Sequence, residues 1–327
     1  DNDGLSGGAG NDTLIGEDGF DYAQYNLPAD AGALTYAVGV DSATVFAGGV
    51  AVLAIQRVLG GGYTVQDLRP GSPLGTDTLA SDVEAVFVFL EGPVGQPPAQ
   101  VLTLNLVPRS DTGFVQGGIF GDLIEASAIP GVDSAQNIGI DGGSGHDVIT
   151  GHAGSNFITG GAGDDVISGG GGIDSAAFVL PLGTPGTLSS VTAGAITLVK
   201  LTEGATTTDV FRITQIAGGW TVEDLRPGSP LGTDTLDQTV ENLSIGIDGG
   251  PGQPPAQSLF LNLTPQFFPN GTGGFVQGGI GGDAISVAVL APAAGVNDVV
   301  GVNGGSGDDA ITGHGGANFI EGGAGND

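Results

Sequence analysis

Several residue types are absent or scarce in this chain of 327 residues. Cysteine and methionine are missing, tryptophan occurs once, and lysine and arginine together number 6. Without cysteine the chain forms no disulfide and has no thiol chemistry, although this absence does not decide its compartment. Lysine occurs only as Lys200, within a strand-like segment, so the sequence contains no phosphate-binding loop of the lysine type.

Long hydrophobic runs are also lacking. The longest apolar stretches, around 45–55 and 284–296, are shorter than a membrane span and are interrupted by glycine or proline. We therefore predict that the chain does not insert into a membrane. The missing methionine and the first residue, Asp1, lead us to expect a processed chain or an excerpt, with any export signal outside it.

The charge is strongly one-sided. Aspartate and glutamate number 36, and the formal net charge is -30. This balance excludes nucleic acid and anionic membranes as partners and favours cations. Two like charges 4 Å apart cost about 1 kcal/mol even in water. We therefore expect the chain to resist folding until a cation neutralises its aspartates.

Glycine, with 65 residues, is concentrated in periodic blocks. The stretch 142–177 divides into four nonapeptides, GGSGHDVIT, GHAGSNFIT, GGAGDDVIS and GGGGIDSAA, and Phe178 follows them. Each unit has glycine in its first and fourth positions and Asp or Asn in its sixth, and three of the four have isoleucine in the eighth. Glycine-rich turns leave carbonyl oxygens unobstructed, and carboxylate and carbonyl oxygens are the ligands that Ca²⁺ prefers.

The stacking of such units follows from their small apolar content. Each unit points one apolar side chain inward, so units must stack before any core exists. Two successive units make one coil, which places Asp147 beside Asp165 on one side and Asn156 beside Asp174 on the other. The first side offers two carboxylates and the second side one. We therefore expect Asp165→Ala to raise the calcium needed for folding more than Asn156→Ala does.

The pattern GGxGxDxUx resembles the RTX (repeats-in-toxin) family of calcium-binding nonapeptides. The resemblance implies a parallel β-roll with several Ca²⁺ ions between its turns, one-step export from a bacterium, and folding when the chain meets calcium outside the cell. It does not imply toxicity, because toxins, proteases, lipases, adhesins and surface layers all carry such repeats.

Further nonapeptides lie at both ends of the chain, and the residues at 326–327 continue the nine-residue register when they are overlaid on 2–3. The units GGIFGDLIE and GGIGGDAIS are degenerate, and for their aspartates a metal-free aspartate in a glycine turn is an equally weighted alternative. The metal-facing residues that we predict are Asp3, Asp12, Asp21, Asp122, Asp147, Asn156, Asp165, Asp174, Asp283, Asp309, Asn318 and Asp327.

Two long segments between the blocks repeat each other. YTVQDLRPGSPLGTDTL from Tyr63 matches WTVEDLRPGSPLGTDTL from Trp220, so the chain is a tandem duplication. Their short, alternating, β-branched runs between Gly and Pro turns predict antiparallel strands in a sandwich-like module. The predicted fold is all-β, with parallel β-roll blocks and these modules in alternation: 1–25 partial roll, 26–116 first module, 117–178 roll, 179–277 second module and 278–327 roll.

Catalytic motifs are weak. The pattern GxSxG occurs once, around Ser6, but in nonapeptide register and without a helix after it, so we predict that the chain is not an enzyme. His152 and His314 each occupy the second position of a unit whose sixth residue is asparagine. A transition-metal ligand and a solvent-exposed turn residue are the alternatives for them, and the second is favoured.

Two arginines stand out in a chain so poor in bases. Arg69 and Arg226 each follow an aspartate by two residues, just before a Pro-Gly turn. An ion pair within the turn is favoured over a sugar-binding role. Tyr63 and Trp220 share one position of the duplication and are expected to be packed in a core.

Two functions remain from these observations. The first is a calcium-dependent structural protein outside a bacterial cell, as a filament, surface layer or adhesin stalk. The second is an accessory calcium-binding or secretion region of a secreted RTX hydrolase or toxin. The tandem duplication and the weak catalytic motifs favour the first. The expected partners are calcium ions and copies of the chain itself or adjoining repeats.

Overall fold

The computed structural model describes residues 2–39, 41–92, 97–111, 113–129, 136–250, 256–269, 273–291, 294 and 298–327. These ranges are almost entirely β-structure with parallel and antiparallel pairs, so the predicted all-β class is confirmed. The short helical segments are η1 (Ala126–Ala128) and α1 (Val287–Leu290). Two compact units are present: the first contains 1–109, 116–124 and 142–147, and the second contains 110–115, 125–141 and 148–327.

The first unit contains two sheets. One has the strand order β1-β3-β9-β10 and the other has the order β2-β8-β7-β6-β5-β4. Their strands are β1 (Gly4–Leu5), β2 (Thr13–Leu14), β3 (Tyr22–Leu27), β4 (Leu34–Val38), β5 (Ser42–Ala47), β6 (Val50–Arg57), β7 (Tyr63–Asp67), β8 (Thr76–Leu79), β9 (Ala85–Leu90) and β10 (Gln100–Asn105).

Parallel pairing in these sheets joins segments far apart in the chain. Strand β2 pairs with β8, with Leu14 opposite Leu79, and β3 pairs with β9, with Tyr25 opposite Val88. Strands β4 to β7 then continue the β2–β8 sheet in antiparallel fashion. Residues 28–75, which we call the first excursion, therefore leave the roll after β3 and return to it at β8.

The second unit repeats this arrangement. One sheet contains the order β14-β16-β18-β24-β25 and another the order β15-β17-β23-β22-β21-β20-β19. These strands are β14 (Ile138–Asp141), β15 (Val148–Thr150), β16 (Asn156–Thr159), β17 (Val166–Ser168), β18 (Ser175–Leu180), β19 (Thr187–Ala193), β20 (Ile196–Glu203), β21 (Thr206–Ile216), β22 (Gly219–Asp224), β23 (Thr233–Asp237), β24 (Asn242–Ile247) and β25 (Gln257–Asn262).

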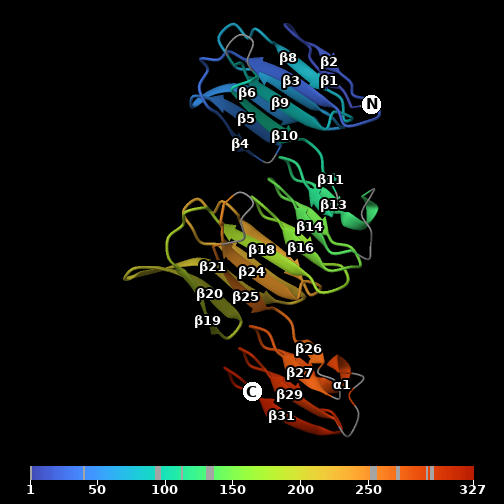
Figure 1. Ribbon diagram of the computed structural model, residues 1–327, viewed down its shortest axis with the longest axis vertical. Helices are drawn as coiled ribbons and strands as arrows, with labels where there is room; N and C mark the ends of the chain where they lie inside the picture. Colours follow the sequence, from blue (N-terminus) through green and yellow to red (C-terminus); the bar gives the residue numbers. More distant parts are fainter. Residues whose placement is uncertain are drawn as a thin grey trace. The chain divides into compact units, whose positions relative to one another are not determined.

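Figure 1 shows β18 directly beside β24, although much of the second copy separates them in sequence. Residues 181–232, the second excursion, contain β19 to β22 and leave and rejoin the roll in the same way as the first. The last part of the unit holds two small sheets, β26-β27-β29-β31 and β28-β30. Their strands are β26 (Gln266–Pro269), β27 (Gly274–Gln277), β28 (Ala284–Ser286), β29 (Val299–Asn303), β30 (Ala310–Thr312) and β31 (Ala317–Glu321).

Three short strands, β11 (Arg109–Asp111), β12 (Phe114–Gln116) and β13 (Leu123–Glu125), lie where the chain passes from one unit to the other. The stretches ending in IGID and VGVN form β14 and β29, which pair in parallel with β16 and β31. They are therefore coils of the roll that depart from the nonapeptide sequence. The five-part division made from the sequence stays a prediction.

The core of the roll consists of the eighth-position side chains. Ile149, Ile158 and Ile167 are at most 1% exposed, whereas their seventh-position neighbours Val148 and Val166 are about half exposed. This alternation is the period of two that a strand imposes. Burial of each isoleucine stabilises the stack by about 1.5–3 kcal/mol, and only stacked coils provide that burial.

The antiparallel strands were expected, but their place in the fold was not. They extend the sheets of the roll and form no separate layered module with sheets of its own among the described residues. The physical reason lies in the segment that ends each excursion. SPLGTDTLA, residues 72–80, has Gly75, Asp77 and Leu79 in the fourth, sixth and eighth positions of a nonapeptide. The returning chain can therefore stack as another coil.

Candidate metal centre

The turns of the roll depend on glycine at specific positions. Gly161 and Gly163 have φ of 104° and 130°, a region that residues with a side chain rarely adopt. The first-position glycines are needed for close approach. A Cβ atom at Gly169 would collide with the carbonyl oxygen of Thr239 in the next coil and with Asp174 Oδ2 in its own coil.

The sixth-position residues form a carboxylate ladder, in which Oδ1 of one coil accepts the backbone N–H of the sixth residue in the preceding coil. Asp21 accepts from Asp3 at 2.7 Å, and Asp174 accepts from Asn156 at 2.6 Å, each across 18 residues. Asp327 accepts from Asp309 at 3.1 Å across the same interval. The ladder therefore stacks these predicted residues along the roll.

The degenerate units also contribute to the ladder. Asp147 accepts the N–H of Asp122 at 2.7 Å across 25 residues. Asp309 accepts the N–H of Asp283 at 2.8 Å across 26 residues. The longer intervals correspond to coils that depart from the nine-residue repeat. Asp122 is also 3.7 Å from the guanidinium of Arg57, so part of its charge is balanced within the chain.

The ladder continues into residues that the sequence analysis did not predict. Asp77 and Asp234 accept the N–H of Asp12 and Asp165 at 3.0 and 2.9 Å, across 65 and 69 residues. The available signal was the Gly-x-Asp-x-Leu spacing within LGTDTL of both copies. That spacing matches half of a nonapeptide, but the first half of the motif is SPL in place of GGx.

Two glutamates extend the ladder on the side of the roll opposite to Asp77 and Asp234. Glu84 accepts the N–H of Asp21 at 2.6 Å, and Glu241 accepts the N–H of Asp174 at 2.8 Å. The sequence gives almost no signal for these glutamates. Around Glu84, the only feature shared with the nonapeptide is an acidic residue two positions before an apolar one, in Glu84-Ala85-Val86.

Fifth-position residues confirm that these returning segments are turns of the roll. In the nonapeptide coils, Phe20 N–H donates to Asn2 Oδ1 at 2.9 Å. The same bond recurs after the excursions, where Thr76 N–H donates to Asn11 Oδ1 and Thr233 N–H donates to Asp164 Oδ1, both at 2.8 Å. The excursions therefore interrupt the chain but not the stacking.

Asn156 shows what surrounds a sixth-position side chain. Its Nδ2 amide is the donor to Gly154 O at 2.7 Å, Gly169 O at 2.9 Å, Asp174 Oδ1 at 2.8 Å and His152 O at 3.3 Å. Oxygen atoms of two successive coils thus converge on one point, and in this coil an amide nitrogen occupies it. Asn318 Nδ2 likewise donates to His314 O and Gly316 O at 3.1 and 3.0 Å.

In the aspartate coils a carboxylate oxygen occupies that point. Gly169 and Gly304 face Asp174 Oδ2 and Asp309 Oδ2 in the way that Gly151 faces Asn156 Nδ2. An oxygen cannot donate to the surrounding carbonyl groups. Within the described part of the chain, the Oδ2 atoms that are fully buried and receive no hydrogen bond include those of Asp12, Asp21, Asp174 and Asp309.

Burial makes the negative charges of these side chains costly. It raises the pKa of Asp174, against the hydrogen bonds from Asn156, and it raises the pKa of Glu241. Burial raises the pKa of Asp122 and of Asp283 to about 6. A cation beside these groups would reverse this effect because it favours the ionised carboxylate.

The oxygen set fits a hard cation. In the described ranges, no three His, Cys, Asp or Glu side chains converge as a metal cluster, and the oxygens that lie nearest the ladder carboxylates are backbone carbonyl oxygens. Ca²⁺ takes about six to eight oxygens, with carbonyl groups among them. The ladder carboxylates and the turn carbonyls would hold it, and the ion would supply the positive charge that the buried oxygens need.

The predicted ligands differ in burial and in their neighbouring coils. Strand register sets Phe157 opposite Ser175, which places the coils of Asn156 and Asp174 next to each other, and it sets Val148 opposite Val166 within the second unit. Asp3 and Asp327 are exposed, whereas Asp21, Asp147, Asp165 and Asp174 are at most 1% exposed.

The histidines differ from the favoured expectation. His152 is 2% exposed and is therefore not a solvent-exposed turn residue. The next coil covers it, since Gly171 N–H donates to its carbonyl oxygen, and its Nδ1 accepts the N–H of Gly154 at 3.2 Å. His314 is half-buried, and its Nδ1 lies 2.7 Å from Asn318 Oδ1.

The arginine turns match the favoured expectation. Arg69 Nε and Nη2 each donate to Asp67 at 2.9 Å, and Arg226 makes the same two bonds to Asp224 at 2.8 and 2.7 Å. Tyr63 and Trp220 are 6% and 3% exposed, so both are packed as predicted.

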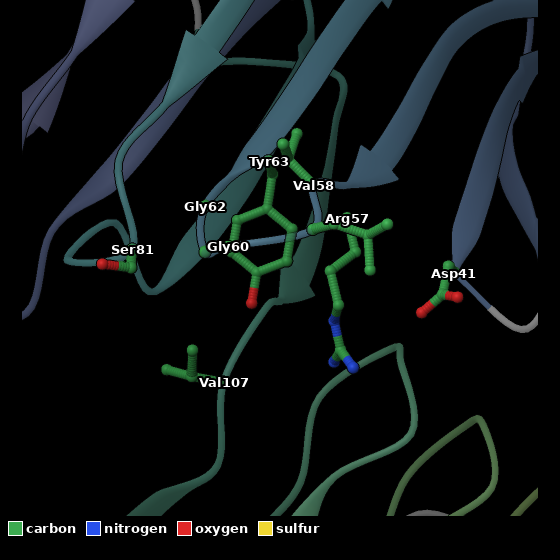
Figure 2. Close-up of a pocket in the computed structure, with 10 residues that line it drawn as sticks. Asp41, Arg57, Val58, Gly60, Gly62, Tyr63, Ser81 and Val107 are labelled. Carbon is green, nitrogen blue, oxygen red and sulfur yellow. The ribbon is translucent and has the colours of Figure 1, made fainter.

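A pocket of about 370 Å³ lies in the first unit beside Tyr63. Figure 2 shows the Arg57 side chain between Tyr63 and Asp41 in this view. Two of the polar side chains that line it already have partners, because Tyr63 OH donates to Leu106 O at 2.7 Å and Arg57 Nη1 donates to Gly121 O at 2.8 Å. These bonds serve to pack the excursion against the roll.

The fold and the ladder thus define a β-roll whose turns present oxygen ligands to hard cations. The family described as the RTX calcium-binding nonapeptide repeat (4 copies) matches residues 1–23, 141–176 and 302–327. These three stretches therefore carry the RTX calcium-binding nonapeptide repeat that the resemblance indicated. No curated protein matches the chain. Within the described ranges, no helix combines the length and apolar character that crossing a membrane requires.

Proposed function

We propose that this chain is a calcium-dependent structural protein outside the cell, without enzymatic activity, whose β-roll folds and stiffens when calcium binds. The observation that carries the proposal is the set of buried Oδ2 atoms that face carbonyl oxygens in the turns. Such oxygens repel one another in a stacked roll unless a cation lies among them. The extracellular location is supported by the RTX repeats, which are typical of secreted proteins.

The chain couples folding to calcium through its own ligands. Each coil supplies only half of a site, so the carboxylate of one coil meets the carbonyl groups of the next only after stacking. Extracellular calcium modules bind with dissociation constants of about 10⁻⁴ to 10⁻³ M. An unfolded chain exported from a calcium-poor cytoplasm would therefore fold in the medium.

A structural role is supported by the duplication, because the same arrangement of roll and excursion occurs twice along the chain. Coils of this kind bury their apolar side chains only against neighbouring coils. We propose that copies of the chain or adjoining repeats stack in this way, as in a filament, surface layer or adhesin stalk.

Calcium dependence is tested by circular dichroism and sedimentation velocity in chelator and in millimolar Ca²⁺. We expect an expanded chain with little β signal in chelator and a compact β-rich chain in calcium. An unchanged compact β spectrum after exhaustive chelation would contradict the proposal. Electron microscopy of the calcium-loaded protein at high concentration tests assembly. If only isolated particles appear, the proposals of a filament and of a surface layer are contradicted.

A further inference from the structure

The two glutamates that end the carboxylate ladder lie outside the residues that match the repeat family. Glu84 follows the first excursion and Glu241 follows the second. Each accepts the N–H of the last nonapeptide aspartate before the excursion, Asp21 or Asp174. The same arrangement thus occurs twice in the chain, with the same residue types.

Asp174 presents an oxygen toward this region without a hydrogen bond from any described residue. The residue is 0% exposed, and its Oδ2 is fully buried. Asp21 is also 0% exposed, and its Oδ2 is in the same state. A buried carboxylate oxygen that receives no donor is costly, so a positively charged ligand is the natural occupant of the space beside it.

A backbone carbonyl oxygen of the returning chain lies on the same side. The first-position glycine Gly169 faces both Asp174 Oδ2 and Thr239 O. In the first copy, Gly16 faces both Asp21 Oδ2 and Asp82 O. In the neighbouring coil, Asn156 Nδ2 donates to the corresponding carbonyl, Gly169 O, at 2.9 Å. In the coil of Asp174 the two facing atoms, Asp174 Oδ2 and Thr239 O, are both oxygens, so neither can donate a hydrogen bond to the other.

The returning carbonyl is anchored in position by its own residue. Thr239 Oγ1 accepts the N–H groups of Gly169 and Gly170 at 2.8 and 3.1 Å. In the first copy, Asp82 accepts the N–H groups of Gly16 and Glu17 at 3.0 and 3.1 Å. Different side chains thus make the same contact in the two copies, which indicates that the position of the carbonyl group matters.

We propose a calcium site at the base of each excursion, with ligands from Asp174, Thr239 O and Glu241 in the second copy and from Asp21, Asp82 O and Glu84 in the first. This inference rests on the proposed calcium function and adds sites that the repeat motif does not contain. Because the ligands come from both ends of an excursion, the ion joins the chain that leaves the roll to the chain that returns. Calcium therefore holds the antiparallel strands to the roll.

The test compares Glu241→Gln with wild-type protein by isothermal titration with Ca²⁺ and by hydrogen exchange of β19 to β22. Glutamine keeps an oxygen that accepts the Asp174 N–H, so the substitution removes the charge while the hydrogen bond is retained. We expect the variant to bind one calcium ion fewer, or that ion about tenfold or more weakly. At calcium concentrations that saturate the wild type, exchange of the second excursion should become faster. Glu84→Gln should do the same for β4 to β7.

Glu223→Gln is the matched control. Glu223 is a carboxylate on β22 of the same excursion, its side chain is 40% exposed, and it pairs with Arg212 away from the ladder. This variant should keep the wild-type calcium stoichiometry.

The outcomes separate the site from the proposed function. If wild-type protein binds no calcium, both fall. If wild-type protein binds calcium and Glu241→Gln binds the same number of ions with the same affinity, only the site at the base of the excursion is overturned. Should Glu241→Gln fail to fold, a crystal structure of the wild type with calcium decides. An ion between Asp174 and Glu241 supports the site, and filled nonapeptide turns without an ion there overturn it.

Discussion

Asn156 and Asp174 occupy the same position in successive coils, yet only Asn156 offers a hydrogen-bond donor to the oxygen atoms around it. The Asn156 amide donates hydrogen bonds to the oxygens around it, whereas Asp174 adds another oxygen to a similar set. The comparison teaches that the oxygens of a coil need a hydrogen-bond donor or a cation at this point, and that the chain can provide the donor from its own atoms. Where it does not, an external cation must do so.

Other buried carboxylates of the chain extend this comparison. Asp67 is balanced by the guanidinium of Arg69, and Asp77 by the phenol of Tyr25, whose hydroxyl donates to its Oδ2 at 3.0 Å. Amide, phenol and guanidinium groups thus supply donors to buried oxygens from within the chain. Among the described residues, the buried Oδ2 atoms of Asp12, Asp21, Asp174 and Asp309 receive no such donor.

Removal of calcium should have the largest effect and should separate the aspartate coils from the asparagine coils. In chelator, we expect cooperative loss of the roll, because the apolar core of each coil exists only in the stack. Hydrogen exchange followed by mass spectrometry should show the earliest loss of protection around Asp174 and Asp309 and later loss around Asn156. Equal loss in all coils at every intermediate calcium concentration would contradict a difference between aspartate and asparagine coils.

Asn156→Asp converts one kind of coil into the other. The change removes the donor from the oxygens around Nδ2 and adds a buried charge, so the variant should lose about 3 kcal/mol of stability at low calcium. Saturating calcium should restore most of this loss, with one more ion bound. Urea unfolding at several calcium concentrations measures the effect.

Asn26→Asp is the control for that substitution, because Asn26 is exposed on β3 and the charge change is the same. It should leave the calcium dependence unchanged. An Asn156→Asp variant that is equally destabilised with and without calcium would show that the carboxylate does not bind the ion.

Tyr25→Phe tests the phenol as a substitute for a cation. Tyr25 and Asp77 are 4% and 1% exposed, so loss of the hydroxyl leaves a buried carboxylate oxygen without its donor. We expect a loss of about 2 kcal/mol in the free energy of unfolding. Chemical denaturation with calcium held constant measures it.

The arginine turns should show the smallest effect and a different pH dependence. Burial raises the pKa of Asp67, but hydrogen bonds from Arg69 and from the Leu74 and Arg69 N–H groups outweigh it and hold the pKa below its ordinary value. A depressed pKa contributes stability above the ordinary pKa, and this contribution is lost as the pH falls through the folded value. The turn should therefore keep its contribution from pH 7 down to about pH 4.

Arg69→Lys should cost about 1 kcal/mol at neutral pH, because lysine cannot make the two-bond contact. Hydrogen exchange of the Leu74 amide, which donates to Asp67 Oδ2 at 2.9 Å, reports on the turn directly. Its protection relative to wild type should be lower at pH 7, and the difference should shrink as the pH falls below the ordinary pKa of an aspartate and Asp67 becomes protonated. The corresponding Leu231 amide in the second copy is an internal control. Equal protection of the Leu74 amide in both proteins at pH 7 would contradict the prediction, because it would show that the Arg69–Asp67 pair does not stabilise the turn.

The sequence by itself determined the repeat and its chemistry. The nine-residue period predicts glycine turns, inward residues such as Ile158, and the two sides of the roll, since all of these depend on neighbours within about two units. The all-β class and the paired arginine turns follow from similarly local patterns, whereas the packing of Tyr63 and Trp220 was predicted from their large apolar rings. Whether the predicted ladder residues bind calcium stays a prediction.

Only the tertiary structure decided where the roll continues. Asp77, Glu84, Asp234 and Glu241 join the ladder across 63 to 69 residues, and a period of nine cannot predict a contact at that distance when the first half of the motif is lost. The burial of His152 was inaccessible for a related reason, since the next coil covers it. Stacking, which is a non-local contact, decides which carboxylates meet a carbonyl oxygen and which meet a donor.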